Sequence, residues 1–195
     1  MKISGYGKKM LVSGIILAVV LTGTACTKQL HQEPVVTEST AQQTIDPLSF
    51  EAVDAKLRDY TFALNEYMKD HQDEKMSKTL NGTTPNGVAA DCVYTVTPDG
   101  KYEALQMQKK IVNGVQMDEY FNMGDSVFIA RTTIYDDGNF DPVDKYYIVD
   151  GVIYKVDGSA KTVTRVVALD EEAAGAKKTE LDLFFTFDEI RAIYA

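Results

Sequence analysis

A series of closely spaced turn signals between Asp91 and Leu169 is the feature that most constrains the fold of this chain. Runs rich in Val, Ile, Tyr, Phe and Thr are typical of strands, and short Gly, Asp, Asn or Pro sequences divide them. The turn signals are Pro98-Asp99-Gly100, Asn113-Gly114, Gly124-Asp125, Asp136 to Asp141, Asp150-Gly151 and Asp157-Gly158. Connections this short join antiparallel strands, because a parallel neighbour needs a crossover of a dozen residues or more. The stretch therefore predicts an antiparallel meander of about seven strands.

The hairpin at Asn113-Gly114 can close in two ways. A two-residue turn would divide the apolar side chains of its two strands between opposite faces of the sheet. A three-residue loop with a bulge would gather them on one face, and we favour that loop. The gathered side chains would be Leu105, Met107, Ile111, Val115, Met117 and Phe121.

The hairpin at Asp150-Gly151 gives a different pattern. A two-residue turn there pairs Tyr147 with Tyr154, and Ile148 with Ile153, so apolar groups lie on both faces. The run at 126–130, "SVFIA", is apolar on both faces in the same way. We expect this part of the sheet to be covered twice or to line a cavity.

Helical patterns flank the meander. Asp46 followed by Pro47 suits an N-cap and first helical position, and an apolar stripe follows at intervals of three and four. The stripe is Phe50, Val53, Leu57, Tyr60, Leu64 and Tyr67. Residues 69–86 are interpreted as a polar connector. After the meander we expect a short helix in "DEEAAGAKK", a strand in "LDLFF", and a final helical turn opened by a capping box of Thr186 and Glu189.

The predicted fold class is α+β, with a long N-terminal helix packed on a curved antiparallel meander and a short C-terminal helix. This single domain would span residues 46–195. Cys92 lies in the strand-like run "DCVYTV" and is expected to be a small buried hydrophobic residue.

The first 25 residues are typical of an export signal. Lys2, Lys8 and Lys9 precede an apolar run that is too short to span a membrane and ends in small residues before Cys26. This arrangement resembles the lipobox of bacterial lipoproteins, although Gly23 stands where that family prefers Leu. The resemblance implies cleavage before Cys26 and attachment to its thiol of a diacylglycerol, which carries fatty acyl chains such as palmitate. An uncleaved anchor or an ordinary signal peptide with an incidental Cys26 are the alternatives.

Residues 26–45 lack aromatic side chains and show no apolar period, so we expect a flexible tether between the lipid and the domain. The order of elements in 46–195 also loosely resembles the LolA-like lipoprotein-carrier fold. That resemblance implies a half-barrel whose concave face holds acyl chains. Cystatin-like and similar helix-plus-sheet folds share the same element order.

Charge narrows the choice of partners. Because three of the 20 basic residues lie in the leader, the rest of the chain has 17 basic against 29 acidic residues, a formal charge of −12. Binding to nucleic acid depends on Lys and Arg contacts to phosphates, so we expect no nucleic-acid partner. The membrane would be a partner only through the N-terminal lipid.

Chemical motifs are scarce, and we expect no metal site, no cofactor and no enzymatic activity. Asp137, Asn139 and Asp141 have the spacing of a calcium loop, but Pro142 replaces the required Gly and Ile148 the bidentate Glu. A hairpin turn is the better interpretation, and a looser cation site is left open. The two histidines, His31 and His71, do not form a zinc motif.

The 11 tyrosines suggest a binding role, although Tyr also simply favours strands. The candidate binding surface is Tyr146, Tyr147 and Tyr154. We therefore expect an extracytoplasmic, membrane-anchored lipoprotein whose non-catalytic domain binds a partner protein or a small ligand. The alternatives are a carrier of hydrophobic molecules in a sheet-lined cavity and a hydrolase that uses carboxylates.

Overall fold

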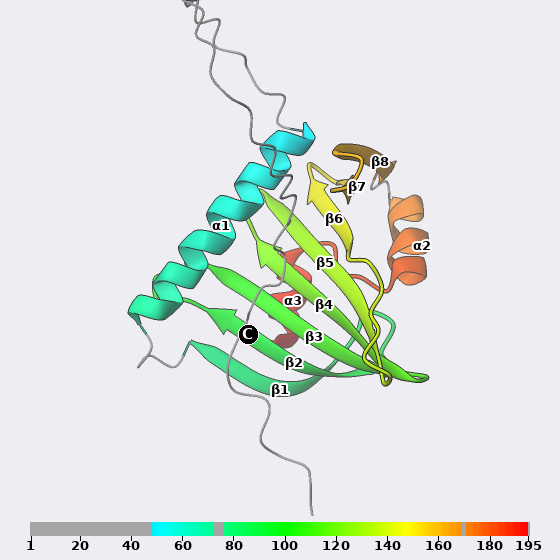
Figure 1. Ribbon diagram of the computed structural model, residues 1–195, viewed down its shortest axis with the longest axis horizontal. Helices are drawn as coiled ribbons and strands as arrows, with labels where there is room; N and C mark the ends of the chain where they lie inside the picture. Colours follow the sequence, from blue (N-terminus) through cyan, green and yellow to red (C-terminus); the bar gives the residue numbers. More distant parts are fainter. Residues whose placement is uncertain (1–47, 72–75, 169–170, 195) are drawn as a thin grey trace, which may run out of the picture. The chain divides into compact units, whose positions relative to one another are not determined.

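The computed structural model describes residues 48–71, 76–168 and 171–194. Within these ranges a helix precedes an eight-stranded antiparallel sheet, and two helices follow it. The elements are α1 (Phe50–Asp70), β1 (Ser77–Thr83), β2 (Ala89–Val96), β3 (Glu103–Ile111), β4 (Gly114–Asn122), β5 (Ser126–Tyr135), β6 (Asp144–Val149), β7 (Val152–Asp157), β8 (Thr162–Ala168), α2 (Glu171–Leu181) and α3 (Phe187–Tyr194). The strands lie in chain order, which confirms the α+β class and the antiparallel meander (Figure 1). The leader, Cys26 and the tether lie outside the described residues.

The long helix begins later than predicted. Its N-cap is Ser49, whose Oγ accepts a hydrogen bond of 3.2 Å from the backbone N–H of Ala52. The prediction of an N-cap at Asp46 was wrong, because Ser caps as well as Asp does and Ser49 directly precedes the first apolar residue of the stripe. Asp46 itself lies outside the described residues. The stripe is confirmed by the burial of Val53, Leu57 and Leu64.

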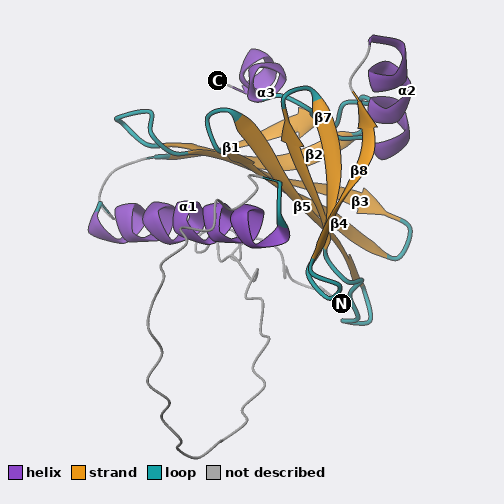
Figure 2. Ribbon diagram, turned by 90° about the horizontal axis from the view of Figure 1, so that it is seen from above, coloured by secondary structure: helices purple, strands orange, loops and turns teal. Residues whose placement is uncertain are grey.

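α1 crosses one face of the sheet near one end of its strands, and α3 lies on the opposite face (Figure 2). The ring of Tyr60 packs edge-on against Tyr102 and Phe121, with centroids 5.4 and 6.2 Å apart. Lys56, one turn earlier, reaches Asp125 with an Nζ–Oδ1 distance of 2.6 Å. These contacts hold α1 over the end of the sheet that carries the turn between β4 and β5.

The opposite face is covered by the C-terminal segment. Its apolar side chains fill a single cluster with those of the central strands, and Phe184 packs edge-on against Tyr120 and Tyr194. Burial of each large apolar side chain contributes roughly 1.5 to 3 kcal/mol, so this layer accounts for much of the stability of the fold. The segment contributes Leu183, Phe184, Phe185, Phe187, Ile190 and Tyr194 to the cluster. The part of the sheet around 126–130 and the Asp150-Gly151 hairpin was expected to be covered twice or to line a cavity, and it is covered by this layer on one face and contacted by α1 on the other.

Two predictions about the strands were wrong. The polar connector contains a strand, β1, which pairs with β2 along its whole length from Ser77↔Thr95 to Thr83↔Ala89. The hairpin between β3 and β4 turns through Val112 and Asn113 and pairs Ile111 with Gly114, so no bulge gathers the six apolar side chains on one face. Because each face has its own cover, dividing these side chains between the faces buries them anyway.

The remaining hairpin and the C-terminal elements are closer to expectation. The turn at Asp150-Gly151 pairs Tyr147 with Tyr154 and Ile148 with Ile153, as predicted. The predicted capping box is also present, because the backbone N–H of Glu189 donates to Thr186 Oγ1 at 3.3 Å and Glu189 Oε2 accepts from Thr186 N–H at 3.4 Å. The predicted helix in "DEEAAGAKK" is α2, beside β8.

The predicted strand in "LDLFF" is absent. Residues 183–186 have no regular secondary structure, and Leu183, Phe184 and Phe185 are buried against the sheet by their side chains. A continuous apolar run is compatible with any segment that is buried all round, and here it forms a connector between two helices.

Candidate functional site

The three tyrosines of the predicted binding surface do not form one exposed patch. Tyr146 and Tyr147 are both buried, and as neighbours on β6 they point to opposite faces of the sheet. Tyr147 and Tyr154 are direct cross-strand partners and share a face. The hydroxyl of Tyr147 lies 3.3 Å from Lys56 Nζ of α1, so this residue serves the packing of α1 on the sheet.

The loop of Asp137, Asn139 and Asp141 uses its polar side chains to form the turn. Asp137 accepts hydrogen bonds from the backbone and side-chain N–H groups of Asn139, at 2.9 and 2.8 Å. Asp141 accepts one from the hydroxyl of Tyr135 at 3.0 Å. Among the described residues, no group of three or more His, Cys, Asp or Glu side chains is arranged to hold a metal ion.

Cys92 is buried, as expected, and its thiol lies 3.7 Å from both Ala90 O and the Tyr194 hydroxyl. Burial raises the pKa of this thiol above its ordinary value, and the contact with Tyr194 only partly opposes that effect. A thiol in this environment is a core residue and a poor nucleophile.

A cleft of about 430 Å³ opens at the end of the sheet that α1 crosses. It is bounded by the turn between β4 and β5, the turn between β6 and β7, and the residues that lead into α3. Its floor is apolar and consists of the buried side chains of Val127, Ile148, Phe185 and Phe187. A concave site with an apolar floor and a few polar groups at its mouth is typical of ligand-binding sites, so we treat this end cleft as the candidate functional site.

The rim of the end cleft is mainly acidic. Asp125, Asp150 and Asp188 come from three separate segments, and Arg191 of α3 is the cation in the lining. Hydrogen bonds from Lys56 and Ser126 hold the pKa of Asp125 below its ordinary value. A general acid requires a raised carboxyl pKa, so Asp125 is suited to holding a negative charge at the rim and not to proton transfer.

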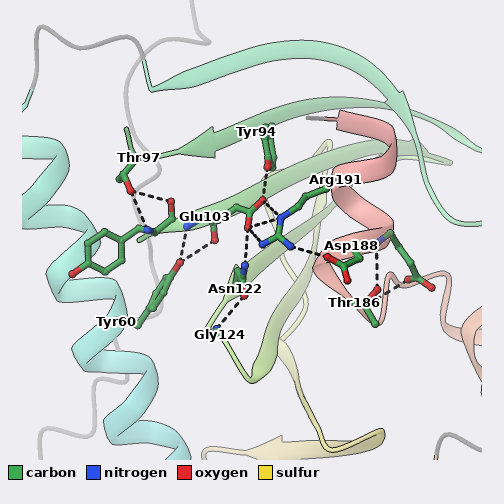
Figure 3. Close-up of polar contacts among 11 residues, drawn as sticks. Tyr60, Tyr94, Thr97, Glu103, Asn122, Gly124, Thr186, Asp188 and Arg191 are labelled. Carbon is green, nitrogen blue, oxygen red and sulfur yellow. Dashed lines mark hydrogen bonds and ion pairs between the residues drawn. The ribbon is translucent and has the colours of Figure 1, made fainter. Parts of the chain in front are cut away.

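Behind the rim, Arg191 is fixed by a buried carboxylate, that of Glu103 on β3 (Figure 3). Arg191 Nε donates to Glu103 Oε1 and Oε2 at 2.9 and 3.1 Å, and Asn122 Nδ2 donates to Oε2 at 2.7 Å. The Tyr94 hydroxyl donates to Oε1. Burial would raise the pKa of Glu103, but the hydrogen bonds from Arg191, Tyr94 and Asn122 outweigh it and hold the pKa below its ordinary value.

The backbone of Glu103 connects this cluster to α1. The hydroxyl of Tyr60 accepts a hydrogen bond from the N–H of Glu103 and donates one to its carbonyl oxygen, both at 2.9 Å (Figure 3). Glu103, the first residue of β3, therefore holds α1 on one face of the sheet through its backbone and α3 on the other through its side chain. The end cleft is consequently lined by elements that are fixed with respect to the sheet, as a preorganised binding site requires.

A second polar cluster anchors the segment between α2 and α3. Arg131 on β5 pairs with Asp118 at 2.6 and 2.8 Å and also donates to the carbonyl oxygens of Leu181 and Asp182. Lys109 binds the Asp182 carboxylate at 2.7 Å. These groups are satisfied by one another, so the cluster acts as a structural support for the C-terminal segment.

No family model, no curated protein and no solved structure matches the chain. Within the described residues, none of the helices combines the length and apolar character that crossing a membrane requires. The end cleft was missed in the sequence because its lining comes from three segments far apart in the chain: the turn between β4 and β5, the turn between β6 and β7, and the connector that leads into α3. Each segment had a signal in the sequence: the turn dipeptides Gly124-Asp125 and Asp150-Gly151, and the capping residue Thr186. No local pattern shows that these three segments meet.

Proposed function

We propose that this chain is an extracytoplasmic lipoprotein, anchored by lipid at Cys26, whose domain binds a cationic ligand in the end cleft without catalysis. The observation that carries the binding function is the end cleft itself, with its buried apolar floor and three carboxylates on its rim. Its cation, Arg191, is already paired with Glu103 and Asp188, and Asp125 is paired with Lys56 of α1. With Asp150 included, four carboxylates stand against two cations. The unbalanced charge at the mouth is therefore negative, and a ligand with an apolar body and a positive group is its chemical complement.

The lipid anchor is supported by the leader, residues 1–25, and by Cys26 directly after it. Two acyl chains hold a protein at a bilayer far longer than one, because each buried methylene contributes about 0.8 kcal/mol. A coil of about 20 residues has a root-mean-square reach of roughly 25 Å, so the tether would let the domain stand clear of the lipid headgroups.

The anchor is tested by Cys26→Ala in the full chain, with Cys92→Ala as the matched control. We expect Cys26→Ala to leave the chain unprocessed or to release it from membranes, whereas Cys92→Ala stays membrane-bound. Normal processing and membrane retention of Cys26→Ala would contradict acylation at this residue.

Binding is tested by calorimetry on the full chain with three probes. Phenethylammonium combines a ring with a cation, phenylacetate combines the same ring with an anion, and a short Phe-Lys peptide presents the cation as a partner protein would. We expect the two cationic probes to bind and phenylacetate to bind at least about tenfold more weakly, as a difference of about 1.4 kcal/mol implies. Tighter binding of the peptide than of phenethylammonium would favour a protein partner, and the reverse a small ligand.

The location is tested with the pair of substitutions Asp150→Asn and Asp188→Asn. Two exposed ion pairs of about 0.2 to 1 kcal/mol each correspond to a loss of roughly two- to thirtyfold in affinity for the cationic probes. Asp136→Asn, an exposed aspartate just beyond the far end of β5, is the matched control and should have no effect. Equal affinity for cationic and anionic probes would refute binding in the end cleft. A loss of affinity in the Asp136→Asn control as large as that in the doubly substituted chain would also refute it.

A further inference from the structure

The sheet is open, and β1 forms one of its two edges (Figure 1). β1 pairs with β2 in an unbroken register, and its other side has no strand partner among the described residues. An edge strand offers its backbone N–H and C=O groups to a further strand, and proteins usually hinder this with proline, charged side chains, a β-bulge or a covering segment. At the opposite edge, the pairing of β7 with β8 contains a bulge, and α2 lies beside β8. β1 contains neither proline nor bulge.

The odd-numbered residues of β1 direct their backbone groups away from β2. In an antiparallel pair, every second residue exchanges hydrogen bonds with the neighbouring strand, and the residues between them point their N–H and C=O groups to the other side. At the two ends of this ladder, Val96 N–H donates to Met76 O at 3.1 Å and Thr84 N–H donates to Val88 O at 2.8 Å. These bonds place the even-numbered residues on the β2 side. The backbone groups of the odd-numbered residues therefore point toward the open side.

One of the outward-facing residues already has a partner. The Thr83 N–H donates to the Tyr194 hydroxyl at 3.2 Å, and this hydroxyl donates to the Thr83 carbonyl oxygen at 2.7 Å. The outward backbone groups of the other three residues have no partner on this side within the described part of the chain. These three are Ser77, Thr79 and Asn81, and the last two are exposed. The unoccupied stretch of the edge is therefore centred on Thr79.

We propose that β1 pairs antiparallel with β1 of a second copy of this chain, about a two-fold axis at Thr79. Thr79 then lies opposite the second copy's Thr79, and Ser77 lies opposite its Asn81. Each of these pairs exchanges two backbone hydrogen bonds, so the two sheets continue into one another. The axis lies at Thr79 because Tyr194 already occupies the backbone groups of Thr83. The contact is small, so we expect a reversible dimer that forms in the micromolar to millimolar range.

The side chains of β1 match one another in this symmetric register, which favours a second copy over an unrelated strand. On one face, Thr79 meets its own copy and Ser77 meets Asn81, and such short polar side chains hydrogen-bond well across strands. On the other face, Lys78 lies opposite Leu80, so the one charged residue in the sequence of β1 is not directly opposite its own copy. Leu80 is partly buried against the core cluster, and the apolar stem of Lys78 extends its cover. A two-fold contact requires a surface that is complementary to itself, as β1 is here.

Amide hydrogen exchange on the full chain tests the pairing. The backbone N–H groups of Ser77, Thr79 and Asn81 should exchange more slowly as the protein concentration rises, because the dimer gives them hydrogen-bond acceptors. Their exchange follows the fraction of monomer, so a sample that is about nine-tenths dimer should exchange about tenfold more slowly. The N–H of Lys78, which faces β2, is the matched control and should not depend on concentration. Exchange of the three outward groups at one unchanged rate up to millimolar concentration would overturn the proposal.

Cysteine cross-linking locates the two-fold axis. In the proposed register the Cα atoms of the two Thr79 residues lie about 5.5 Å apart, within reach of a disulfide, whereas those of the two Asn81 residues lie roughly 13 Å or more apart. Copper-catalysed air oxidation should therefore link Thr79→Cys into a dimer. Asn81→Cys, which is also exposed and on the same face, should give no more dimer than the unsubstituted chain, whose Cys26 and Cys92 provide the background. Equal amounts of dimer from both variants would overturn the proposal.

Thr79→Pro distinguishes backbone pairing from a contact between side chains. It removes the outward N–H and leaves the β2 side intact, and proline is tolerated on the open side of an edge strand. Two hydrogen bonds per dimer are lost, so the dissociation constant, measured from the exchange of the Asn81 amide, should rise at least about fivefold. Thr79→Val keeps the N–H and should dimerise like the unsubstituted chain. Unchanged dimerisation of Thr79→Pro with a native circular dichroism spectrum would overturn the proposal, and exchange and cross-linking decide it if this variant does not fold.

Discussion

Replacing Arg191 by Met isolates the ion pair that holds α3 on the sheet. The Glu103 side chain is only 6% exposed, whereas that of Arg191 is 44% exposed. The substitution keeps a side chain of similar length but leaves the Glu103 carboxylate with only Tyr94 and Asn122 as polar side-chain partners. A carboxylate that is buried and has lost its cation is the costly product of this change.

The magnitude follows from the geometry. Breaking a fully buried pair costs about 3 to 5 kcal/mol, but the half-exposed guanidinium of Arg191 is partly screened by water, so we expect a loss of about 2 to 3 kcal/mol. With a urea dependence of about 2 kcal/mol per M, the unfolding midpoint should fall by roughly 1 to 1.5 M. Asp188 is the other partner of the same guanidinium, and its own side chain is 89% exposed. Asp188→Asn should therefore change stability by less than about 0.5 kcal/mol.

The loss of stability in Arg191→Met should also depend on pH. The depressed pKa of Glu103 contributes stability that is fully present above the carboxyl pKa of the unfolded chain and disappears as the pH falls through the folded-state pKa. In Arg191→Met the pKa of Glu103 should rise, so the difference between the two proteins should shrink between about pH 7 and about pH 4. Urea unfolding followed by circular dichroism at both pH values measures it. A loss no larger than that of Asp188→Asn, or one that grows on acidification, would refute the reasoning.

Three further predictions concern the core. The buried hydroxyl of Tyr120 approaches the backbone of Phe184 without forming a hydrogen bond. Tyr120→Phe should therefore leave the urea midpoint unchanged or raise stability by up to about 1 kcal/mol. A loss of stability above about 1 kcal/mol would contradict this expectation. A Cβ at Gly82 would lie 2.3 Å from Cε1 of the buried Tyr194 ring, so Gly82→Ala should cost about 1 to 3 kcal/mol, and much less in a Tyr194→Ala background. Cys92 should react with a thiol reagent only in urea, and the unfolded chain should show one thiol if Cys26 is acylated and two if it is free.

The elements that the sequence predicted well are those with a local cause. Turn dipeptides located most of the hairpins, the Tyr147–Tyr154 pairing followed from a two-residue turn, and Thr186 and Glu189 formed the expected capping box. The errors arose where a tertiary partner decides. β1 is a mostly polar strand that exists because β2 offers it a complete ladder of hydrogen bonds, and its own sequence has no apolar alternation that would indicate a strand.

The bulge predicted at Asn113-Gly114 was wrong for a related reason. It assumed that the sheet buries one face, so that all apolar side chains should gather there. The C-terminal segment, some 70 residues further along the chain, covers the second face, and a regular two-residue turn then buries Leu105 on one side and Phe121 on the other. A similar separation in sequence hid the end cleft, because Asp125 and Arg191 of its lining are 66 residues apart.

Glu103 and Glu119 show how partners decide what a buried carboxylate does. Both lie on central strands and both are buried, but they point to opposite faces of the sheet. Glu103 meets a cation and two further donors, its pKa falls, and its charge holds α3 in place. Glu119 meets one amide, its pKa rises, and its charge destabilises the fold as the pH rises through that value. The sequence presents both as a glutamate in a strand, and only the residues that the fold brings beside each carboxylate decide whether its charge stabilises the domain.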